Sequence, residues 1–473
     1  MSYGELSNTQ ETMVLPMLQM KNIRGKPYIT VSAKGMINGL SNIPNDGADF
    51  GPDTTLGATA PTQTGSPYTE TYGIQEAVSY ATATNLNYVK LNPGTYTWQP
   101  VPTSQYVTLQ SVAIEGSGID ETIITLANST DHFDIPFYVN SNVRISGITF
   151  NMQSNNNTSY TPSAIWLLNP SQYIEIDHCK FINQAVADFI QCEATFNSTS
   201  PPTGYIEKVR IHNNIFNANI PSGMVADECI AINNSKYVDI FNNTFIFDGT
   251  GSMTNGFFSI YDYSRHTHIY GNRFIITGAS PHNPFMNLSD TYDAYFENNV
   301  IEANVTNTNA SIIGVQNVSK YVYIKNNMAI GILAPGYYSF LAFILFGLSA
   351  DAVQNGSGGP DGNVSQNAGW NDYIVISNNY IIGLYALIAF AFTGNQNFNY
   401  LEISNNITGT LRLIGNPFAY ANQNNGTFIF ENNYEIGDIL IGYTQIGGGE
   451  AWFNPAPPSG YTLAQLIIRN NNI

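Results

Sequence analysis

Residues 237–245 read YVDIFNNTF, and the core of this pattern recurs along the chain. In each copy an apolar residue and a variable residue precede Asn-Asn or a close relative, and more apolar residues follow. Clear copies are IHNNIF from Ile211, IFNNTF from Ile240, IYGNRF from Ile269, FENNVI from Phe296, IKNNMA from Ile324, ISNNYI from Ile376, ISNNIT from Ile403, FENNYE from Phe430 and IRNNNI from Ile468. Weaker copies come earlier, as IEGSGI from Ile114, ISGITF from Ile145 and IDHCKF from Ile176. A chain of 473 residues is long enough for several globular domains. The repetition predicts instead a single solenoid, which grows by stacking repeats.

The spacing of the copies narrows the type of solenoid. Successive copies start 31, 31, 35, 29, 29, 27, 28, 52, 27, 27 and 38 residues apart. A repeat near 28 residues is too short for a four-stranded propeller blade, and the apolar/polar alternation indicates strands rather than helices. Three short strands and three turns fit into one repeat. The sequence therefore predicts an all-β fold, a right-handed single-stranded parallel β-helix.

The repeated Asn has a physical explanation in such a stack. Equivalent residues of neighbouring coils lie about 4.8 Å apart, so identical carboxamides can donate and accept hydrogen bonds along the axis. Asn also tolerates the left-handed backbone conformation that a sharp turn demands. We predict a structural ladder formed by the second Asn of each copy, namely Asn214, Asn243, Asn272, Asn299, Asn327, Asn379, Asn406, Asn433 and Asn471.

Irregular spacing locates the insertions and the domain boundaries. Residues 1–44 are expected to form an N-terminal extension or attachment segment, residues 45–110 a capping helix and the first coil, and residues 111–473 the β-helix. Lateral loops are expected near 194–204, 351–372 and 447–462, where Gly, Ser, Asn and Pro gather. Loops on a rigid solenoid are suited to recognition. The last coil has no obvious cap, so we expect an open sheet edge that a partner subunit or a further domain would cover.

Composition limits the function classes. The chain has 34 acidic and 16 basic side chains, a net charge of −18, and an acidic surface of this kind repels nucleic acid and polyanionic glycans. Neutral glycans remain compatible, and the 30 Tyr offer sugar-stacking faces, although aromatic residues are also common in strands. The three cysteines, Cys179, Cys192 and Cys229, match neither a disulfide framework nor a zinc motif and are predicted to be buried thiols.

Targeting signals are not visible in the sequence. The N-terminal residues lack a basic segment followed by an apolar one, so no secretory signal peptide is apparent. The longest apolar run, Tyr337 to Leu348, is too short to span a bilayer and is interpreted as a buried strand.

Three N-terminal segments carry a family resemblance. NDGADF at 45–50, TETYGIQEAVSYATATN at 69–85 and YVKLNPGTYTW at 88–98 resemble the opening of the pectate-lyase-like (pectin-lyase-like) superfamily. There, a short amphipathic helix plugs the first coil, and Ile74, Ala77, Val78 and Ala81 have the spacing of one helix face. The superfamily contains pectate lyases, polygalacturonases, phage tailspikes and non-catalytic surface proteins, so the resemblance implies a fold more strongly than a function.

The same resemblance supplies candidate catalytic residues. VADFIQC at 186–192 and VADECIA at 225–231 fall in adjacent coils, and the second resembles the polygalacturonase segment Gly-Asp-Asp-Cys-Ile-Ala. The resemblance implies that Asp188, Asp227 and Glu228 occupy the places of three active-site carboxylates in an inverting glycoside hydrolase. It also allows Ca²⁺ on these acids, as in the lyases, and implies no other cofactor.

The sequence departs from the polygalacturonase pattern in the next coil. TNGFF at 254–258 stands where a Gly-His-Gly motif is expected, and no Arg-Ile-Lys segment is found. Arg265, His266 and His268 are nearby in sequence but in the wrong strand position. The alternative reading makes Asp188 and Asp227 turn residues.

Glycosylation sequons add a surface signal. The candidates are Asn355, Asn363, Asn128, Asn157, Asn197 and Asn425, although composition alone predicts about ten sequons in such a chain.

Two hypotheses follow from these features. The sequence favours a non-enzymatic, thermostable spike or fibre on a virion or cell surface, such as that of an archaeal virus. It would bind a host glycan or receptor as a homo-oligomer or with other virion subunits, without contacting nucleic acid or crossing a membrane. The alternative is a polysaccharide-degrading hydrolase or lyase.

Overall fold

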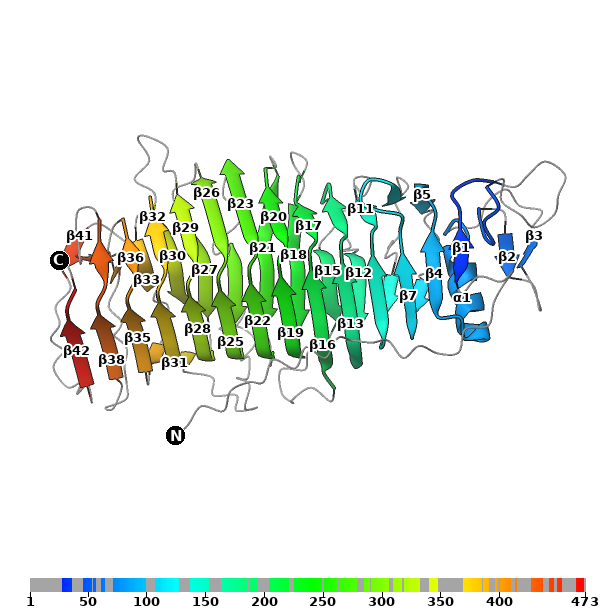
Figure 1. The fold of residues 1–473 in the computed structure, drawn as a ribbon. Helices are drawn as coiled ribbons and strands as arrows, with labels where there is room; N and C mark the ends of the chain where they lie inside the picture. The colour runs from blue at the N-terminus through cyan, green and yellow to red at the C-terminus, as the bar shows by residue number, and fades with distance from the viewer. Residues whose placement is uncertain are drawn as a thin grey trace.

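The computed structural model describes the coils and the capping elements of the chain, over residues 28–35, 46–52, 54–56, 61–63, 71–98, 107–126, 137–152, 163–184, 188–193, 204–220, 225–248, 251–261, 264–278, 285–289, 291–305, 309–316, 319–331, 340–347, 369–384, 386–390, 396–398, 400–409, 413–414, 427–436, 442–445, 449–452 and 465–471. The strands stack into a solenoid whose coils follow one another from the N-terminal to the C-terminal end (Figure 1). The predicted right-handed parallel β-helix is confirmed.

Three parallel sheets form the walls. Sheet 1 has 15 strands, β1 (Ile29–Val31), β4 (Tyr88–Leu91), β7 (Val112–Glu115), β10 (Val143–Ser146), β13 (Ser171–Asp177), β16 (Ile206–His212), β19 (Ser235–Phe241), β22 (Arg265–Tyr270), β25 (Tyr292–Glu297), β28 (Lys320–Lys325), β31 (Gly369–Ser377), β35 (Tyr400–Ser404), β38 (Thr427–Glu431) and β42 (Gln465–Arg469), with β34 (Gln396–Phe398) paired to β31.

Sheet 2 has 12 strands, β5 (Gly94–Trp98), β8 (Thr122–Leu126), β11 (Thr149–Asn151), β14 (Lys180–Ile182), β17 (Ile215–Asn217), β20 (Thr244–Phe247), β23 (Arg273–Gly278), β26 (Val300–Val305), β29 (Met328–Gly331), β32 (Tyr380–Ile382), β36 (Ile407–Thr408) and β39 (Tyr434–Glu435). Sheet 3 has 11 strands, β6 (Val107–Leu109), β9 (Phe137–Val139), β12 (Ser163–Leu168), β15 (Asp188–Glu193), β18 (Val225–Asn233), β21 (Ser252–Tyr261), β24 (Met286–Ser289), β27 (Asn309–Gln316), β30 (Phe340–Gly347), β33 (Ala386–Phe390) and β37 (Leu413–Ile414).

Smaller elements complete the fold. Two antiparallel pairs, β2 (Thr54–Leu56) with β3 (Pro61–Gln63) and β40 (Gly442–Gln445) with β41 (Gly449–Trp452), lie outside the three walls. Strand β1 pairs with β4, so sheet 1 begins inside the segment 1–44 that the sequence assigns to an extension. Among the described residues no helix has the length and apolar character needed to cross a membrane.

The predicted Asn ladder is confirmed, and all nine residues take part. Nδ2 of Asn214 donates to Oδ1 of Asn243 at 3.1 Å and to the carbonyl of Ile176 at 2.9 Å, and the backbone N–H of Asn214 donates to the same Oδ1 at 3.0 Å. The pattern repeats from coil to coil as far as Asn471. At its N-terminal end the ladder meets Cys179, whose backbone N–H donates to Asn214 at 2.9 Å.

The residue before each ladder Asn has a different role. Asn213, Asn242, Asn298 and the later equivalents adopt left-handed φ angles between 53° and 58°, and Gly271 fills the same place with φ 64°. These residues turn the chain from sheet 1 into sheet 2. The Asn-Asn pair therefore combines a turn residue with a ladder residue.

The core consists of inward-facing columns in register. Phe150, Phe181, Phe216, Phe245 and Phe274 stack on sheet 2 with ring centroids 4.8–5.0 Å apart. The three cysteines are free and buried, as predicted. The apolar run expected to be a buried strand contains β30, where Phe343, Ile344 and Phe346 are fully buried.

Helix α1 (Ile74–Thr84) covers the first coil. It buries Ile74, Ala77, Val78 and Ala81, the face predicted from their spacing, and it packs against β1, β4, β6 and β7. Its C-cap, Asn85, adopts φ 56°, and the N–H of this residue closes the last turn.

We expect Asn299→Ala to lower the free energy of unfolding by roughly 3–4 kcal/mol, because it leaves buried donors and an acceptor of adjacent coils without partners. Asn298→Gly is the matched control, since Asn298 is exposed at φ 57° and Gly tolerates this conformation. Guanidinium unfolding followed by circular dichroism measures the difference. Equal midpoints for the two variants would contradict the role assigned to the ladder.

Candidate functional site

The three acids suggested by the polygalacturonase resemblance come together on sheet 3. Asp188 begins β15, and Asp227 and Glu228 lie in β18, which pairs with β15 through Ile190 and Ile230. Carboxylate oxygens of the three residues lie within 4.8 Å of one another. We call these residues the acid trio. Their proposed catalytic role remains a prediction.

Burial separates the acid trio from an open catalytic groove. Asp188 is 1% exposed and Glu228 is 3% exposed, whereas Asp227 is half-buried. The amide of Gln184 donates to the Glu228 carbonyl at 2.6 Å, and the backbone N–H of Glu228 donates to Asp188 at 2.9 Å. A glycan has no access to Asp188 or Glu228 in this conformation.

Electrostatics favour the protonated form of these acids. Burial, followed by the negative charge of Asp227, raises the pKa of Asp188 to about 7, against the hydrogen bonds from Glu228 that lower it. Burial and the charges of Asp188 and Asp227 raise the pKa of Glu228 well above its ordinary value. Asp188 and Glu228 therefore retain their protons to higher pH than ordinary carboxyls, as desolvated neighbouring acids do.

The surroundings of the acid trio differ from those of a polygalacturonase. Gly256 aligns with Glu228 across β18 and β21, and the next two residues, Phe257 and Phe258, are buried in the core. His266 and His268 belong to β22 on sheet 1 and are therefore on another wall, in keeping with the wrong strand position expected from the sequence.

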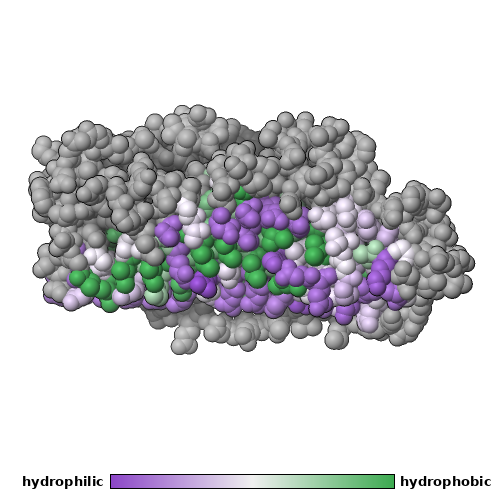
Figure 2. Space-filling model, turned by 90° about the horizontal axis from the view of Figure 1, so that it is seen from above, coloured by the Kyte–Doolittle hydropathy of each residue, from purple (hydrophilic) through white to green (hydrophobic). Residues whose placement is uncertain are grey.

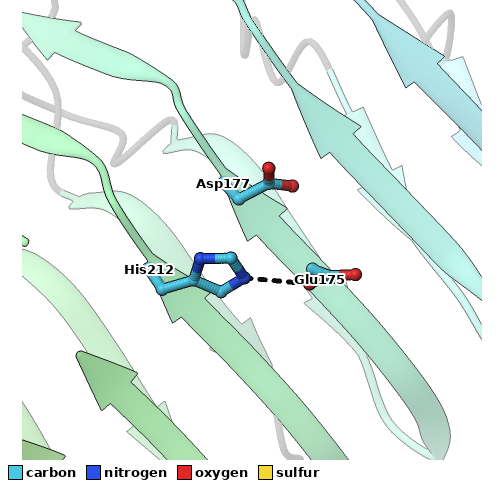
Figure 3. Close-up of side chains that lie close together, drawn as sticks. All are labelled: Glu175, Asp177 and His212. Carbon is cyan, nitrogen blue, oxygen red and sulfur yellow. Dashed lines mark hydrogen bonds and ion pairs between the residues drawn. The ribbon is translucent and has the colours of Figure 1, made fainter. Parts of the chain in front are cut away.

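A second cluster, not identified from the sequence, lies on the outer face of sheet 1 (Figure 3). Glu175 and Asp177 project from β13, and His212 from β16 contacts Glu175 with Nε2 and Oε1 2.8 Å apart. Arg144 donates from Nε and Nη2 to the two oxygens of Asp177 at 2.8 and 2.7 Å. Burial opposes ionisation of Asp177, but the hydrogen bonds from Arg144 and His178 outweigh it and keep the pKa of Asp177 below its ordinary value.

This second cluster does not fit a metal ion. Its three ligand groups lie within 4.8 Å, but the guanidinium of Arg144 already engages both oxygens of Asp177, and His212 engages Glu175. A bound cation would have to displace Arg144 or lie beside its charge. The cluster is therefore an ion-pair network of the wall.

The ion-pair network is part of a longer charged column. Arg144, Glu175, Arg210, Asp239 and His268 align in register on five consecutive strands of sheet 1, so that basic and acidic side chains alternate. Aligning the repeats residue by residue would have revealed this alternation in the sequence.

Aromatic side chains form further columns on the same wall. Phe241 stacks on His212 and on Tyr270 with centroids 4.6 and 4.9 Å apart, and Tyr295 stacks on Tyr323 at 4.7 Å. Rings that stack along the axis turn their faces toward one another. Most of these ring faces therefore contact other rings of the protein, in keeping with the expectation that many Tyr are ordinary strand residues. The ring edges remain for a ligand.

Six tyrosines gather on four consecutive strands of sheet 1, from β25 to β35. Centroid distances of 4.4–6.1 Å connect them. Tyr321 is 36% exposed and is held in the left-handed conformation, with φ 55°. We call this group the tyrosine cluster, and its members are Tyr292, Tyr295, Tyr321, Tyr323, Tyr373 and Tyr400.

The predicted glycosylation sites lie outside the described residues. This applies to Asn128, Asn157, Asn197, Asn355, Asn363 and Asn425. Most of the lateral loops predicted near 194–204, 351–372 and 447–462 lie outside them as well, namely residues 194–203, 351–368, 447–448 and 453–462.

Among known proteins, those similar to this chain are solved structures. A scan against protein-family models finds no match. A search of curated proteins finds none either. Among solved structures, the chain is similar to the A-module of mannuronan C-5 epimerase AlgE6 from Azotobacter vinelandii, with 13% identity, a TM-score of 0.45, and coverage of 84% of this chain and 94% of that one. The surface adhesin PfbA of Streptococcus pneumoniae gives 14% identity, a TM-score of 0.46, and coverage of 80% and 93%. Gene product 12 of bacteriophage phi29 gives 12% identity, a TM-score of 0.43, and coverage of 80% of this chain and 55% of that one.

These similarities concern the fold alone. The three sheets and the coil order define a parallel β-helix of the pectin-lyase-like type. This fold is shared by phage appendage proteins, adhesins and carbohydrate-active enzymes.

The raised pKa of Asp188 makes the stability of the fold depend on pH. Its folded value of about 7 exceeds the ordinary value of 3.8, so between these pH values the folded state binds more protons than the unfolded state. Stability contributed by this group is therefore present below about pH 4 and lost as pH rises to 7, by roughly 3–4 kcal/mol. We expect Asp188→Asn to flatten this part of the profile, measured by unfolding at pH 4, 5, 6 and 7.

Asp248→Asn is the control for this measurement, because Asp248 is an exposed residue directly after β20. Its profile should follow that of the unmodified protein. A profile of Asp188→Asn that coincides with both would show that Asp188 ionises normally in the folded state.

Proposed function

We propose that this protein is a non-enzymatic attachment rod of the tail-spike or fibre type, displayed on a virion or cell surface. It binds a host glycan or receptor through the outer wall of sheet 1. The observation that carries the proposal is the tyrosine cluster, which lies in contact across four coils of a rigid wall.

Tyrosine suits this role because its ring is large and rigid and costs little conformational entropy to order. Stacking between Tyr373 and Tyr400, with centroids 4.4 Å apart, fixes the rings before a ligand arrives. Burial and hydrogen bonding to Glu402 raise the pKa of Tyr400, and burial and Asp293 raise that of Tyr295. These phenols remain protonated at neutral pH and provide hydroxyl groups of the kind that recognise sugars.

The charge of the chain favours a neutral ligand. At a net charge of −18, long-range repulsion disfavours polyanionic glycans. Within the wall, Nζ of Lys325 lies 4.4 Å from the centroid of the Tyr323 ring, so this cation is already engaged. An uncharged glycan or receptor segment is therefore the ligand class we assign to the tyrosine cluster.

The rod itself supports display at a surface. Hydrogen bonds of the Asn ladder run from coil to coil along the axis, which makes the solenoid stiff. We propose an extracellular or virion-surface location. The low share of charged residues, 11%, and the Asn- and Tyr-rich composition favour an archaeal virus as the source.

We expect Tyr321→Asn to weaken binding to a neutral glycan at least about tenfold, which corresponds to about 1.4 kcal/mol. Tyr237→Asn is the matched control, because Tyr237 occupies the equivalent left-handed position three coils earlier, with φ 59°. Asn tolerates this conformation, so both variants should fold. A glycan array followed by surface plasmon resonance measures the effect. Equal affinities of the two variants would remove the tyrosine cluster from the binding surface.

A glycoside hydrolase is the second candidate, because the acid trio gathers three carboxyl groups on adjacent coils of sheet 3. The burial of Asp188 and Glu228 argues against it. We expect incubation with neutral and acidic polysaccharides to release no more reducing ends from the unmodified protein than from Asp227→Asn. Release that this substitution abolishes would replace the binding proposal with an enzymatic one.

A further inference from the structure

An exposed apolar strip runs along sheet 2 near the C-terminal end of the solenoid. Val300, Met328, Tyr380, Ile407 and Tyr434 align in register on the outer face of five consecutive strands. They are 36–47% exposed. Figure 2 shows this face from above, with apolar side chains in a row toward the C-terminal end of the solenoid.

The strip is wider than one column. Ile330, Ile382 and Ile436 lie beside it on the same outer face, and Ile436 is 58% exposed. On the other side lie the exposed left-handed residues Asn326, Asn378, Asn405 and Asn432. From β29 to β39 these three columns contain no charged side chain. We call this surface the apolar strip.

The fold does not require an apolar residue at every position of the central column. In the N-terminal coils that column carries Lys180, Thr244 and Arg273 as well as Ile215. The adjacent column carries Ile182, Ile246 and Ile275 there, so its apolar residues are not confined to the C-terminal coils. The unbroken apolar run of the central column from Val300 to Tyr434 therefore distinguishes the C-terminal coils and marks an interaction surface.

The composition of the apolar strip fits a protein partner better than a sugar. Centres of protein interfaces are rich in Tyr and Met and poor in charge, and most of this strip is aliphatic. Sugar sites need several polar groups that converge on one ligand. Here the polar groups are confined to the flanking Asn column.

The net negative charge of the chain favours a second copy of this chain as the partner, because two copies can approach closely only through an uncharged surface. Each chain carries a net charge of −18, so two copies repel each other wherever their acidic surfaces meet. The uncharged strip lets them approach without burying like charges. Four to five coils at about 4.8 Å span roughly 20 Å, and two such strips face to face bury on the order of 1,000 Å², the lower end of the range for specific interfaces.

We propose that two copies of this chain associate through their apolar strips. The interface is isologous, so the two columns run in opposite directions and the middle residue of one meets the middle residue of the other. Tyr380 is the middle residue of the column and therefore lies near the two-fold axis. Sheet 1 stays free on another wall, so association leaves the tyrosine cluster accessible. This inference is independent of the ligand of that cluster.

Sedimentation velocity of the full chain tests the proposal. We expect the unmodified protein to associate at micromolar concentration and Ile407→Lys to weaken the association at least tenfold. Thr244→Lys is the matched control, because Thr244 lies in the same outer column on β20. Circular dichroism checks that both variants fold. An unmodified protein that stays monomeric, or an Ile407→Lys variant that associates normally, would overturn the proposal.

Cross-linking identifies the partner surface directly. The three native cysteines are buried, so a short bis-maleimide should link Tyr380→Cys into covalent dimers and leave Thr244→Cys monomeric. Equal cross-linking of both variants would contradict the proposed interface. Loss of glycan binding in Ile407→Lys, with a monomeric unmodified protein, would assign the strip to a glycan instead.

Discussion

Hydrogen bonds between buried Asn carboxamides hold the coils in register. Each ladder Asn must satisfy two amide hydrogens and one oxygen away from water, and it does so only when the next coil places an identical group about 3 Å away, as between Asn272 and Asn299 at 3.1 Å. The same oxygen accepts the backbone N–H of Asn272 at 2.9 Å. A coil shifted by one residue would break these bonds and leave the groups unpaired. The ladder therefore fixes the register of the turn and, through it, of sheets 1 and 2.

Because the register is fixed, residues at the same position of successive repeats lie next to one another on the surface. Side chains at one position of the repeat gather into a column, so a modest bias in the sequence becomes a continuous strip or stack on a wall. This explains the alternating charges from Arg144 to His268, the tyrosine cluster and the apolar strip. It also explains the difference between the two halves of sheet 2, where Lys180 and Arg273 give way to Met328 and Ile407 within one column.

The sequence predicts whatever depends on the repeat alone. It predicts the fold class, the nine ladder residues, the buried face of α1 and the buried thiols, because periodicity and residue type determine each of them. It does not reveal the contact between Glu175 and His212, because this contact is diagonal and joins residues that are not aligned in the register of β13 and β16. Nor does it predict the burial of Asp188, because this residue begins β15 on sheet 3, whereas the repeated Asn-Asn pattern marks the turn between sheets 1 and 2.

Two aspartates of one coil show how the walls acquire different chemistry. Asp177 on sheet 1 and Asp188 on sheet 3 are both almost fully buried, at 0% and 1% exposure. The pKa of Asp177 is lowered because Arg144 from the preceding coil donates to both of its oxygens, whereas the pKa of Asp188 is raised because its charged neighbour is another carboxyl. Burial penalises both charges, and the partner supplied by the adjacent coil sets the direction of each pKa shift. Sheet 1 thus keeps fixed charges near its surface, whereas burial and neighbouring negative charge favour the protonated forms of Asp188 and Glu228 on sheet 3. Under the function proposed above, this contrast leaves sheet 1 as the wall that presents charged and aromatic side chains to a ligand, whereas Asp188 and Glu228 are withdrawn from the surface.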